Sequence, residues 1–165
     1  MSEPLQFACD AMLGGLARWL RAAGYDAAWY PDIDDWDFIR IARRESRFLL
    51  SCDTRMFEIG ALRDGEIPSL LLPTGLRKLE QLAFVLERLA LPLLTPRCMA
   101  CGGELVLVAK EHVKERAPPR SFAWVEQFFE CARCKRLFWQ GTHWRRIASS
   151  LQTAGRQDAG GGRQE

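Results

Sequence analysis

Three aspartates occur where short strands are expected to end, a pattern that could support metal-dependent chemistry. Asp10 directly follows the apolar residues 7–9, and Asp53 closes the segment after the apolar run 47–50. Asp35 belongs to an acidic loop that follows a third expected strand. Like charges gathered at one edge repel each other unless a cation neutralises them, and Mg²⁺ or Mn²⁺ takes oxygen ligands while keeping water for chemistry. The three aspartates are therefore candidate ligands of a catalytic metal ion.

A simpler structural interpretation exists for each of these carboxylates. Asp10 could cap the helix that follows it, and the loop aspartates could be helix caps or solvated charges. For Asp37 we favour the simpler interpretation. The carboxylates converge only if their strands lie side by side in a parallel sheet, so the arrangement of the strands decides between the two interpretations.

Four of the six cysteines form two C-x-x-C pairs, which are Cys98, Cys101, Cys131 and Cys134. One such turn places two thiolates on an edge of a tetrahedron, and a second turn closes the tetrahedron. We expect a structural zinc ion with no open position for chemistry. A redox dithiol and an iron–sulfur cluster are alternatives, but two equivalent pairs around a β-rich insert favour neither. Cys9 and Cys52 are expected to be buried small residues rather than ligands.

The elements that must position Asp10 follow from the hydrophobic spacing around it. Residues 7–9 predict a buried strand, and residues 12–23 predict a helix with apolar residues at the i, i+3, i+4, i+7 spacing. Gly24 occupies the place where the end of a helix favours a positive φ, and residues 26–30 predict a second strand. In a strand–helix–strand unit, ligands collect at the carboxyl ends of the strands.

The rest of the chain predicts two further parts and a tail. Helices, strands and an apolar helical stripe continue as far as Pro92, so we predict a three-layer α/β domain with a parallel central sheet over residues 5–92. Residues 97–146 predict a small β-rich zinc ribbon. The polar, Gly-rich residues 153–165 predict a disordered tail.

Composition restricts the class of protein. The chain has 165 residues, of which 48% are hydrophobic and 27% charged, as in ordinary globular proteins. Residues 1–95 hold 11 Lys/Arg and 14 Asp/Glu, whereas residues 96–165 hold 12 Lys/Arg and 7 Asp/Glu. An acidic part joined to a basic part suits a metal site beside a surface for a polyanion. No apolar run approaches the length of a membrane-spanning helix, and the N-terminus has no apolar core of a signal peptide. We therefore expect a cytoplasmic protein without a membrane partner.

Several longer stretches combine into a more specific pattern. In the N-terminal part they are Asp10-x-Met12-Leu13-Gly14-x-Leu16-Ala17-Arg18-Trp19-Leu20-Arg21, Gly24-Tyr25-Asp26, Asp35 leading into Ile41-Ala42-Arg43, and Arg47-Phe48-Leu49-Leu50-Ser51-Cys52-Asp53. In the C-terminal part they are the two C-x-x-C pairs, Pro118-Pro119, and Phe138-Trp139-x-Gly141-x-His143-Trp144. Over about residues 6–150 the chain resembles the PIN-like ribonuclease family called the Mut-seven C-terminal (Mut7-C) domain.

The resemblance implies a PIN-like α/β domain with a C-terminal zinc ribbon, and metal-dependent cleavage of RNA. Carried over by position, the catalytic carboxylates are Asp10, Asp35 and Asp53. The family usually has Thr-Arg-Asp where this chain has Ser51-Cys52-Asp53. Ser51 can keep a hydroxyl near the site, but an arginine is lost, and Arg55 is the candidate to replace its charge.

From the residues and the resemblance together, we predict a Mg²⁺- or Mn²⁺-dependent ribonuclease that acts on single-stranded or structured RNA. The ribbon would hold part of the RNA through its exposed basic residues, which are Arg133, Lys135, Arg136, Arg145 and Arg146. His143 could contact RNA or pack where ribbon and main domain meet, and we favour packing.

Two rival functions remain open. One is a non-catalytic RNA- or ribosome-binding adaptor with a vestigial acidic cleft. The other is an aspartyl-phosphate phosphatase with Asp10 as the nucleophile, although such enzymes normally carry a second aspartate where this chain has Met12.

Overall fold

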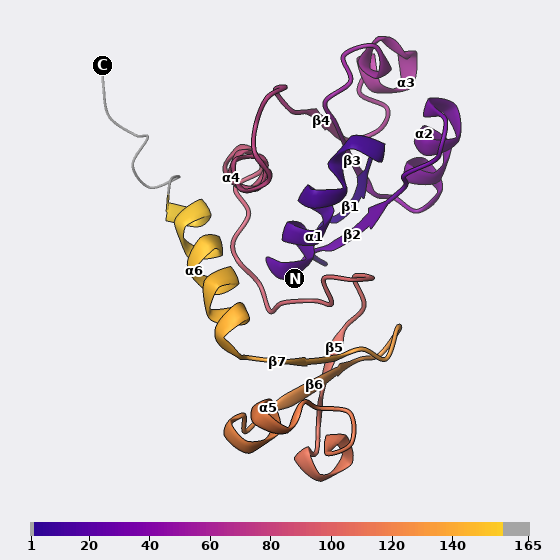
Figure 1. The fold of residues 1–165 in the computed structure, drawn as a ribbon. Helices are drawn as coiled ribbons and strands as arrows, with labels where there is room; N and C mark the ends of the chain where they lie inside the picture. Colours follow the sequence, from indigo (N-terminus) through magenta and orange to yellow (C-terminus); the bar gives the residue numbers. More distant parts are fainter. Residues whose placement is uncertain (1, 157–165) are drawn as a thin grey trace.

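A parallel four-stranded sheet forms the centre of the molecule, in the strand order β2-β1-β3-β4 (Figure 1). We describe a computed structural model, which covers residues 2–156 apart from the side chain of His143. The strands are β1 (Gln6–Cys9), β2 (Asp26–Trp29), β3 (Phe48–Ser51) and β4 (Ser69–Leu71). All three strand pairs are parallel. The predicted parallel α/β arrangement is confirmed.

Helices cover both faces of this sheet. On one face lie α1 (Gly14–Ala22), α4 (Lys78–Arg88) and α6 (Thr142–Arg156), and on the other lie α2 (Asp35–Arg44) and α3 (Gly60–Arg63). The strands alternate accordingly, because Phe7 and Cys9 face the first layer and Ala8 faces the second. Both faces of each central strand are therefore buried, which explains why these strands read as short continuous apolar runs.

The first two crossover helices lie on opposite faces of the sheet, α1 on one and α2 on the other. β2 lies on one side of β1 and β3 lies on the other, so the order of the strands reverses between β1 and β3. In sheets of this kind, a crevice opens at the carboxyl ends of the two strands where the order reverses. Asp10 and the segment 51–53 follow those two strands.

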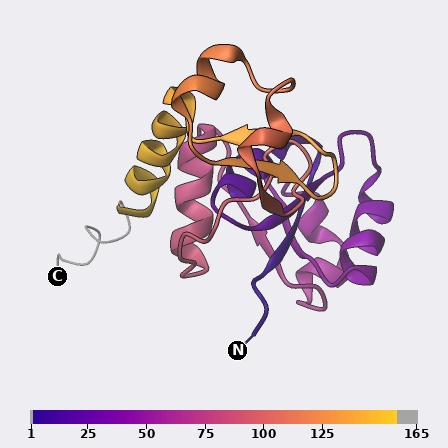
Figure 2. The same ribbon diagram turned by 90° about the horizontal axis from the view of Figure 1, so that it is seen from below.

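A second, antiparallel sheet forms the small C-terminal module. Its strands are β5 (Leu105–Val108), β6 (Phe128–Cys131) and β7 (Leu137–Trp139), paired in that order. The helix α5 (Pro119–Trp124) and the one-turn 3₁₀ helix Lys110–Val113 lie in the insert between β5 and β6. Phe128 is fully buried in a separate small core, against which Trp139 packs. The module lies below the parallel sheet in Figure 1 and in front of it in Figure 2.

Helix α6 returns from the small module to the main domain. It lies beside α4 in both Figure 1 and Figure 2, and Ile147, Leu151 and Ala154 are buried in the main core. Their spacing of four and three residues forms one apolar helix face. The helix continues to Arg156, so residues 153–156 of the segment for which we predicted a disordered tail are helical instead. Residues 157–165 lie outside the described part of the chain.

A buried arginine joins the main domain to the small module. Arg21, in the last turn of α1, is only 8% exposed, and its guanidinium donates from Nε to the carbonyl of Ala27 at 2.8 Å. Its Nη1 donates to the carbonyls of Met99 and Ala100 at 3.0 and 3.1 Å. The first C-x-x-C turn is thereby fixed to the end of α1. None of the helices within residues 2–156 is long and apolar enough to cross a membrane.

Candidate active site and metal centre

Asp10 lies at the carboxyl end of β1 and is only 6% exposed. Its Oδ1 accepts a hydrogen bond from the backbone N–H of Met12 at 3.0 Å, so Asp10 is the N-cap of the 3₁₀ helix Ala11–Leu13. Its Oδ2 accepts a hydrogen bond from the hydroxyl of Ser51. The structural interpretation of Asp10 as a helix cap is therefore correct. The cap uses Oδ1 alone, and Oδ2 is held by Ser51 instead.

Ser51 connects Asp10 to the segment that carries Asp53. Cys9 is in register with Leu50, so the residues that follow them, Asp10 and Ser51, meet at the end of the sheet. The Ser51 side chain is fully buried, and its Oγ also accepts a hydrogen bond from the N–H of Asp53 at 3.0 Å. From the sequence we expected only that Ser51 would keep a hydroxyl near the site. The structure adds that this hydroxyl bonds to both Asp10 and Asp53, because the register of β1 and β3 places Ser51 beside Asp10.

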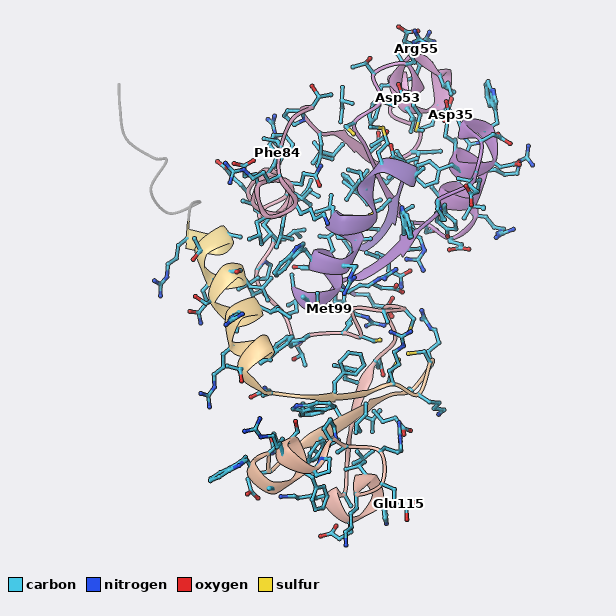
Figure 3. The ribbon with its side chains drawn as sticks, viewed as in Figure 1. Asp35, Asp53, Arg55, Phe84, Met99 and Glu115 are labelled. Carbon is cyan, nitrogen blue, oxygen red and sulfur yellow. The ribbon has the colours of Figure 1, made fainter. Side chains whose placement is uncertain are left out.

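Asp53 is half-buried and starts a turn away from the sheet. Its Oδ1 accepts a hydrogen bond from the N–H of Arg55 at 2.9 Å. No described residue donates to its Oδ2. Arg55 is exposed beside Asp53, and both lie at the upper end of the molecule in Figure 3.

Asp35 lies at the same end of the sheet, after β2, which flanks β1 on the side opposite to β3. It is exposed in the first turn of α2, which begins after β2, and it is labelled at the same end of the molecule as Asp53 in Figure 3. Its neighbour Asp34 is the N-cap of α2 and accepts a hydrogen bond from the N–H of Asp37 at 3.0 Å. Asp37 forms an ion pair of 2.9 Å with Arg40, as expected of a surface charge.

The charges of Asp35 and Asp53 act on Asp10. Burial raises the pKa of Asp10 above its ordinary value of 3.8, and the negative charges of Asp53 and Asp35 raise it further. The hydrogen bonds from Ser51 and Met12 oppose this shift. A buried carboxylate with two acidic neighbours is a site where a cation would be stabilised, because it would remove the repulsion.

The three carboxylates are not drawn into a closed cluster. Among the described residues, the four cysteines form the one group of three or more potential ligands whose donor atoms all lie within 4.8 Å of one another. Asp10, Asp35 and Asp53 are brought to the same end of the sheet, but their oxygens do not all lie within that distance of one another. Their oxygen donors are nevertheless of the type that Mg²⁺ and Mn²⁺ prefer.

The four cysteines have the arrangement of a tetrahedral metal site. The sulfur atoms of Cys98 and Cys134 lie 3.7 Å apart, and those of Cys101 and Cys131 lie 3.4 Å apart. Gly103 fits between them, since a Cβ at this position would lie 2.7 Å from the Cys131 sulfur. The cluster could hold a structural zinc ion and supports the predicted ribbon.

Backbone amides prepare one of these sulfur atoms for a metal. Burial raises the pKa of the Cys131 thiol, but N–H groups of Cys134 and Arg133 point at its sulfur from 3.4 Å and help lower that pKa to about 6. Burial instead raises the pKa of Cys98 to about 12. A metal ion would have to displace the Cys98 proton, because zinc binds the thiolate form.

The other two cysteines, and two tryptophans of the C-terminal part, pack against the cores. Cys9 is fully buried in the main core and Cys52 packs against it. Trp139 packs against the small core and Trp144 against the main core. The expectation that His143 packs between the two parts concerns a side chain outside the described residues.

A scan against protein-family models matches the chain to the Mut7-C RNAse domain over residues 5–151. The match spans both the parallel sheet and the small module, and it confirms the resemblance noted from the sequence. Searches of curated proteins and of solved structures each found no match.

Proposed function

Because the chain belongs to the Mut7-C RNAse domain family, we propose that it is a PIN-like, Mg²⁺- or Mn²⁺-dependent ribonuclease. The family indicates a ribonuclease-type function, and the metal dependence is our inference from the acidic end of the sheet. The observation that carries it is the link through Ser51, which holds the Asp10 carboxylate and the Asp53 backbone together where the strand order reverses.

In this proposal Asp10, Asp35 and Asp53 hold the ion directly or through water. When bound, such an ion activates a water for in-line attack on phosphorus and stabilises charge on the departing oxygen. The protein's own part is positioning, because Ser51 and the amide of Met12 fix the two oxygens of Asp10. The amide of Arg55 fixes one oxygen of Asp53, and the other oxygen, Oδ2, would be available to the ion. The exposed Arg55 side chain would contact the RNA backbone in place of the arginine that the family usually carries.

The small module would bind RNA at a distance from the cleavage site. Lys135 and Arg136 are exposed in the turn between β6 and β7, next to the second cysteine pair. Arg133 is less suited to a binding role, because its Nη1 donates to the carbonyl of Cys101 at 3.0 Å and supports the cysteine cluster. We therefore assign the phosphate contacts to Lys135 and Arg136.

A cleavage assay on single-stranded and structured RNAs tests the proposal. We expect cleavage with Mn²⁺ or Mg²⁺, no cleavage with EDTA, and no detectable cleavage by Asp53→Asn, which removes a charge and barely changes volume. Asp37→Asn is the matched control and should cleave as the wild type does, since Asp37 pairs with Arg40.

The non-catalytic adaptor remains the second candidate, because the three carboxylates do not form a closed cluster. It predicts RNA binding without cleavage in any divalent cation, with Asp53→Asn unchanged in every RNA measurement. Wild-type protein that binds RNA and never cleaves it would contradict the ribonuclease proposal and favour the adaptor.

A further inference from the structure

Two large apolar side chains stand in solvent beside Asp10. Met12 is 74% exposed and Trp29 is 43% exposed. The N–H of Met12 donates to the carboxylate of Asp10, so the Met12 side chain starts next to the acidic end of the sheet. Trp29 ends β2 and is in register with Cys9, the residue before Asp10. Neither side chain contributes to the buried cores.

The indole of Trp29 is held in a fixed position although it is exposed. Its Nε1 donates to the carbonyl of Ala11 at 3.2 Å. Its ring also lies against the first turn of α1, where a Cβ at Gly14 would be 2.8 Å from the ring atom Cε2. The missing side chain at Gly14 thus makes room for the ring. A partner that uses this aromatic face gains affinity because little conformational entropy is lost on binding.

A positive charge lies on the other side of the same turn. Lys78, the first residue of α4, extends along Gly15, where a Cβ would be 2.6 Å from the Lys78 atoms Cδ and Cε. Within residues 2–156, Lys78 forms no ion pair. The start of α1 is therefore flanked by an aromatic ring and a free ammonium group, directly after Asp10.

We propose that Trp29 and Met12 form a base shelf, which stacks one unpaired nucleobase of single-stranded RNA while Lys78 contacts a neighbouring phosphate. This inference rests on the proposed function, which places the RNA backbone at the acidic end of the sheet. Aromatic and apolar side chains accept any base, because every base has a π-face. Bases inside a duplex are stacked on each other and cannot reach the shelf, so the substrate class is RNA with unpaired bases at the cleavage site.

The test measures whether a single base and Trp29 act together. Full-length protein carrying Asp53→Asn is titrated with a short single-stranded RNA and with copies that each lack one base at a different position. Stacking of a base on an aromatic side chain strengthens binding, so we expect one abasic position to weaken binding by about 10-fold or more. Trp29→Ala is then added to the Asp53→Asn protein. This double variant should bind the intact RNA as weakly as the Asp53→Asn protein binds that abasic copy. Its affinities for the intact RNA and for that abasic copy should be equal.

Two further variants keep the test decisive. Met12→Ala changes a side chain in solvent, so it should fold normally and should reduce the same base effect in part. Trp124→Ala is the matched control, because Trp124 is 86% exposed on α5 in the small module. The control should keep the full difference between the intact and abasic RNAs.

The outcomes separate this inference from the proposed function. Equal affinity of the Asp53→Asn protein for all abasic copies, or equal affinity for duplex and single-stranded RNA, would overturn the base shelf even if the wild type cleaves RNA. An apolar protein segment would then be the better candidate for this surface. Loss of the base effect in Trp29→Ala, together with a wild type that cleaves no RNA in any cation, would keep the shelf and reject the catalytic role.

Discussion

At the scale of single residues, Ser51 organises the candidate active site more than its small size suggests. Its hydroxyl is fully buried and is used twice, as a donor to Asp10 and as an acceptor from the Asp53 amide. A buried hydrogen-bonding group that loses its partner costs about 1–3 kcal/mol. The residue therefore affects both the stability and the alignment of two proposed ligands.

We predict that Ser51→Ala lowers the free energy of unfolding by about 1–3 kcal/mol and weakens Mn²⁺ binding. Urea unfolding and calorimetric titration with Mn²⁺ measure the two effects. Ser51→Thr is the control, since it keeps the hydroxyl and introduces the residue that the family usually has at this position. Unchanged Mn²⁺ affinity in Ser51→Ala would contradict a positioning role.

Asp10 gives a prediction with an unusual sign. Its pKa is raised in the folded protein by burial and by acidic neighbours, so the folded state binds more protons than the unfolded state above pH 3.8. Without a divalent cation, stability should therefore decrease as pH rises from about 3.8 through the raised pKa of Asp10. Asp10→Asn removes this loss, so in EDTA at pH 7 the variant should be at least as stable as the wild type.

Thermal unfolding with and without Mn²⁺ checks this prediction. Added Mn²⁺ should raise the midpoint of the wild type, because ligands that bind only the folded state stabilise it, and should leave Asp10→Asn nearly unchanged. A large loss of stability in metal-free Asp10→Asn would show that Asp10 acts mainly as a cap.

At the scale of secondary structure elements, α6 is the helix whose packing in the main core we did not predict from the sequence. Its buried residues Ile147, Leu151 and Ala154 have helical spacing, but we assigned residues 147–152 to no element and predicted a disordered tail from residue 153, because the end of the chain is polar and Gly-rich. Only the packing against α4 reveals the buried face, because tertiary contacts supply most of a helix's stability.

Leu151→Ala should reduce the free energy of unfolding by about 2–5 kcal/mol, the usual cost of truncating a buried leucine. Gln152→Ala, on the exposed side of the same helix, should have no comparable effect. Both are measured by urea unfolding of the full chain. Equal stability of the two variants would mean that α6 is not part of the main core.

The strands and most of the site elements were predictable from local patterns. Short apolar runs bounded by turn residues identified β1, β2 and β3, and Gly24 has the positive φ expected after α1, at 100°. The link from Asp10 through Ser51 was not predictable, since it depends on the register between strands far apart in the sequence. The burial of Arg21 was equally hidden, because a charged residue in a helix is ordinarily assigned to the surface.

At the scale of the whole molecule, Arg21 joins the small module to the main domain by hydrogen bonds, so we expect the two parts to depend on each other for stability. If residues 97–146 were a self-contained zinc ribbon, removing zinc would unfold them and spare the α/β domain. Two of the three carbonyl acceptors of Arg21, those of Met99 and Ala100, lie in the module, so loss of the cysteine cluster would leave a buried charge with the Ala27 carbonyl alone. We now expect the effect to reach α1.

Arg21→Ala should destabilise the full chain by about 3 kcal/mol or more and weaken zinc binding, because several buried carbonyls lose their donor. Arg18→Ala, an exposed arginine one turn earlier, is the matched control and should behave as the wild type. Chemical unfolding and competition with a chromophoric chelator measure the two quantities. Wild-type zinc affinity in Arg21→Ala would show that the module folds independently.

The position of α1 also restricts how the chain can change in length. Asp10 precedes the helix, Arg21 lies in its last turn, and Figure 3 shows Asp53 and Met99 near the opposite ends of that helix. One inserted or deleted residue would rotate the two ends relative to each other by about 100° and shift them by about 1.5 Å. Either Asp10 would turn away from Ser51 or Arg21 from the first cysteine pair. The exposed face of this helix can accept substitutions. Its number of residues is fixed, because Asp10 must reach Ser51 at one end while Arg21 reaches the first cysteine pair at the other.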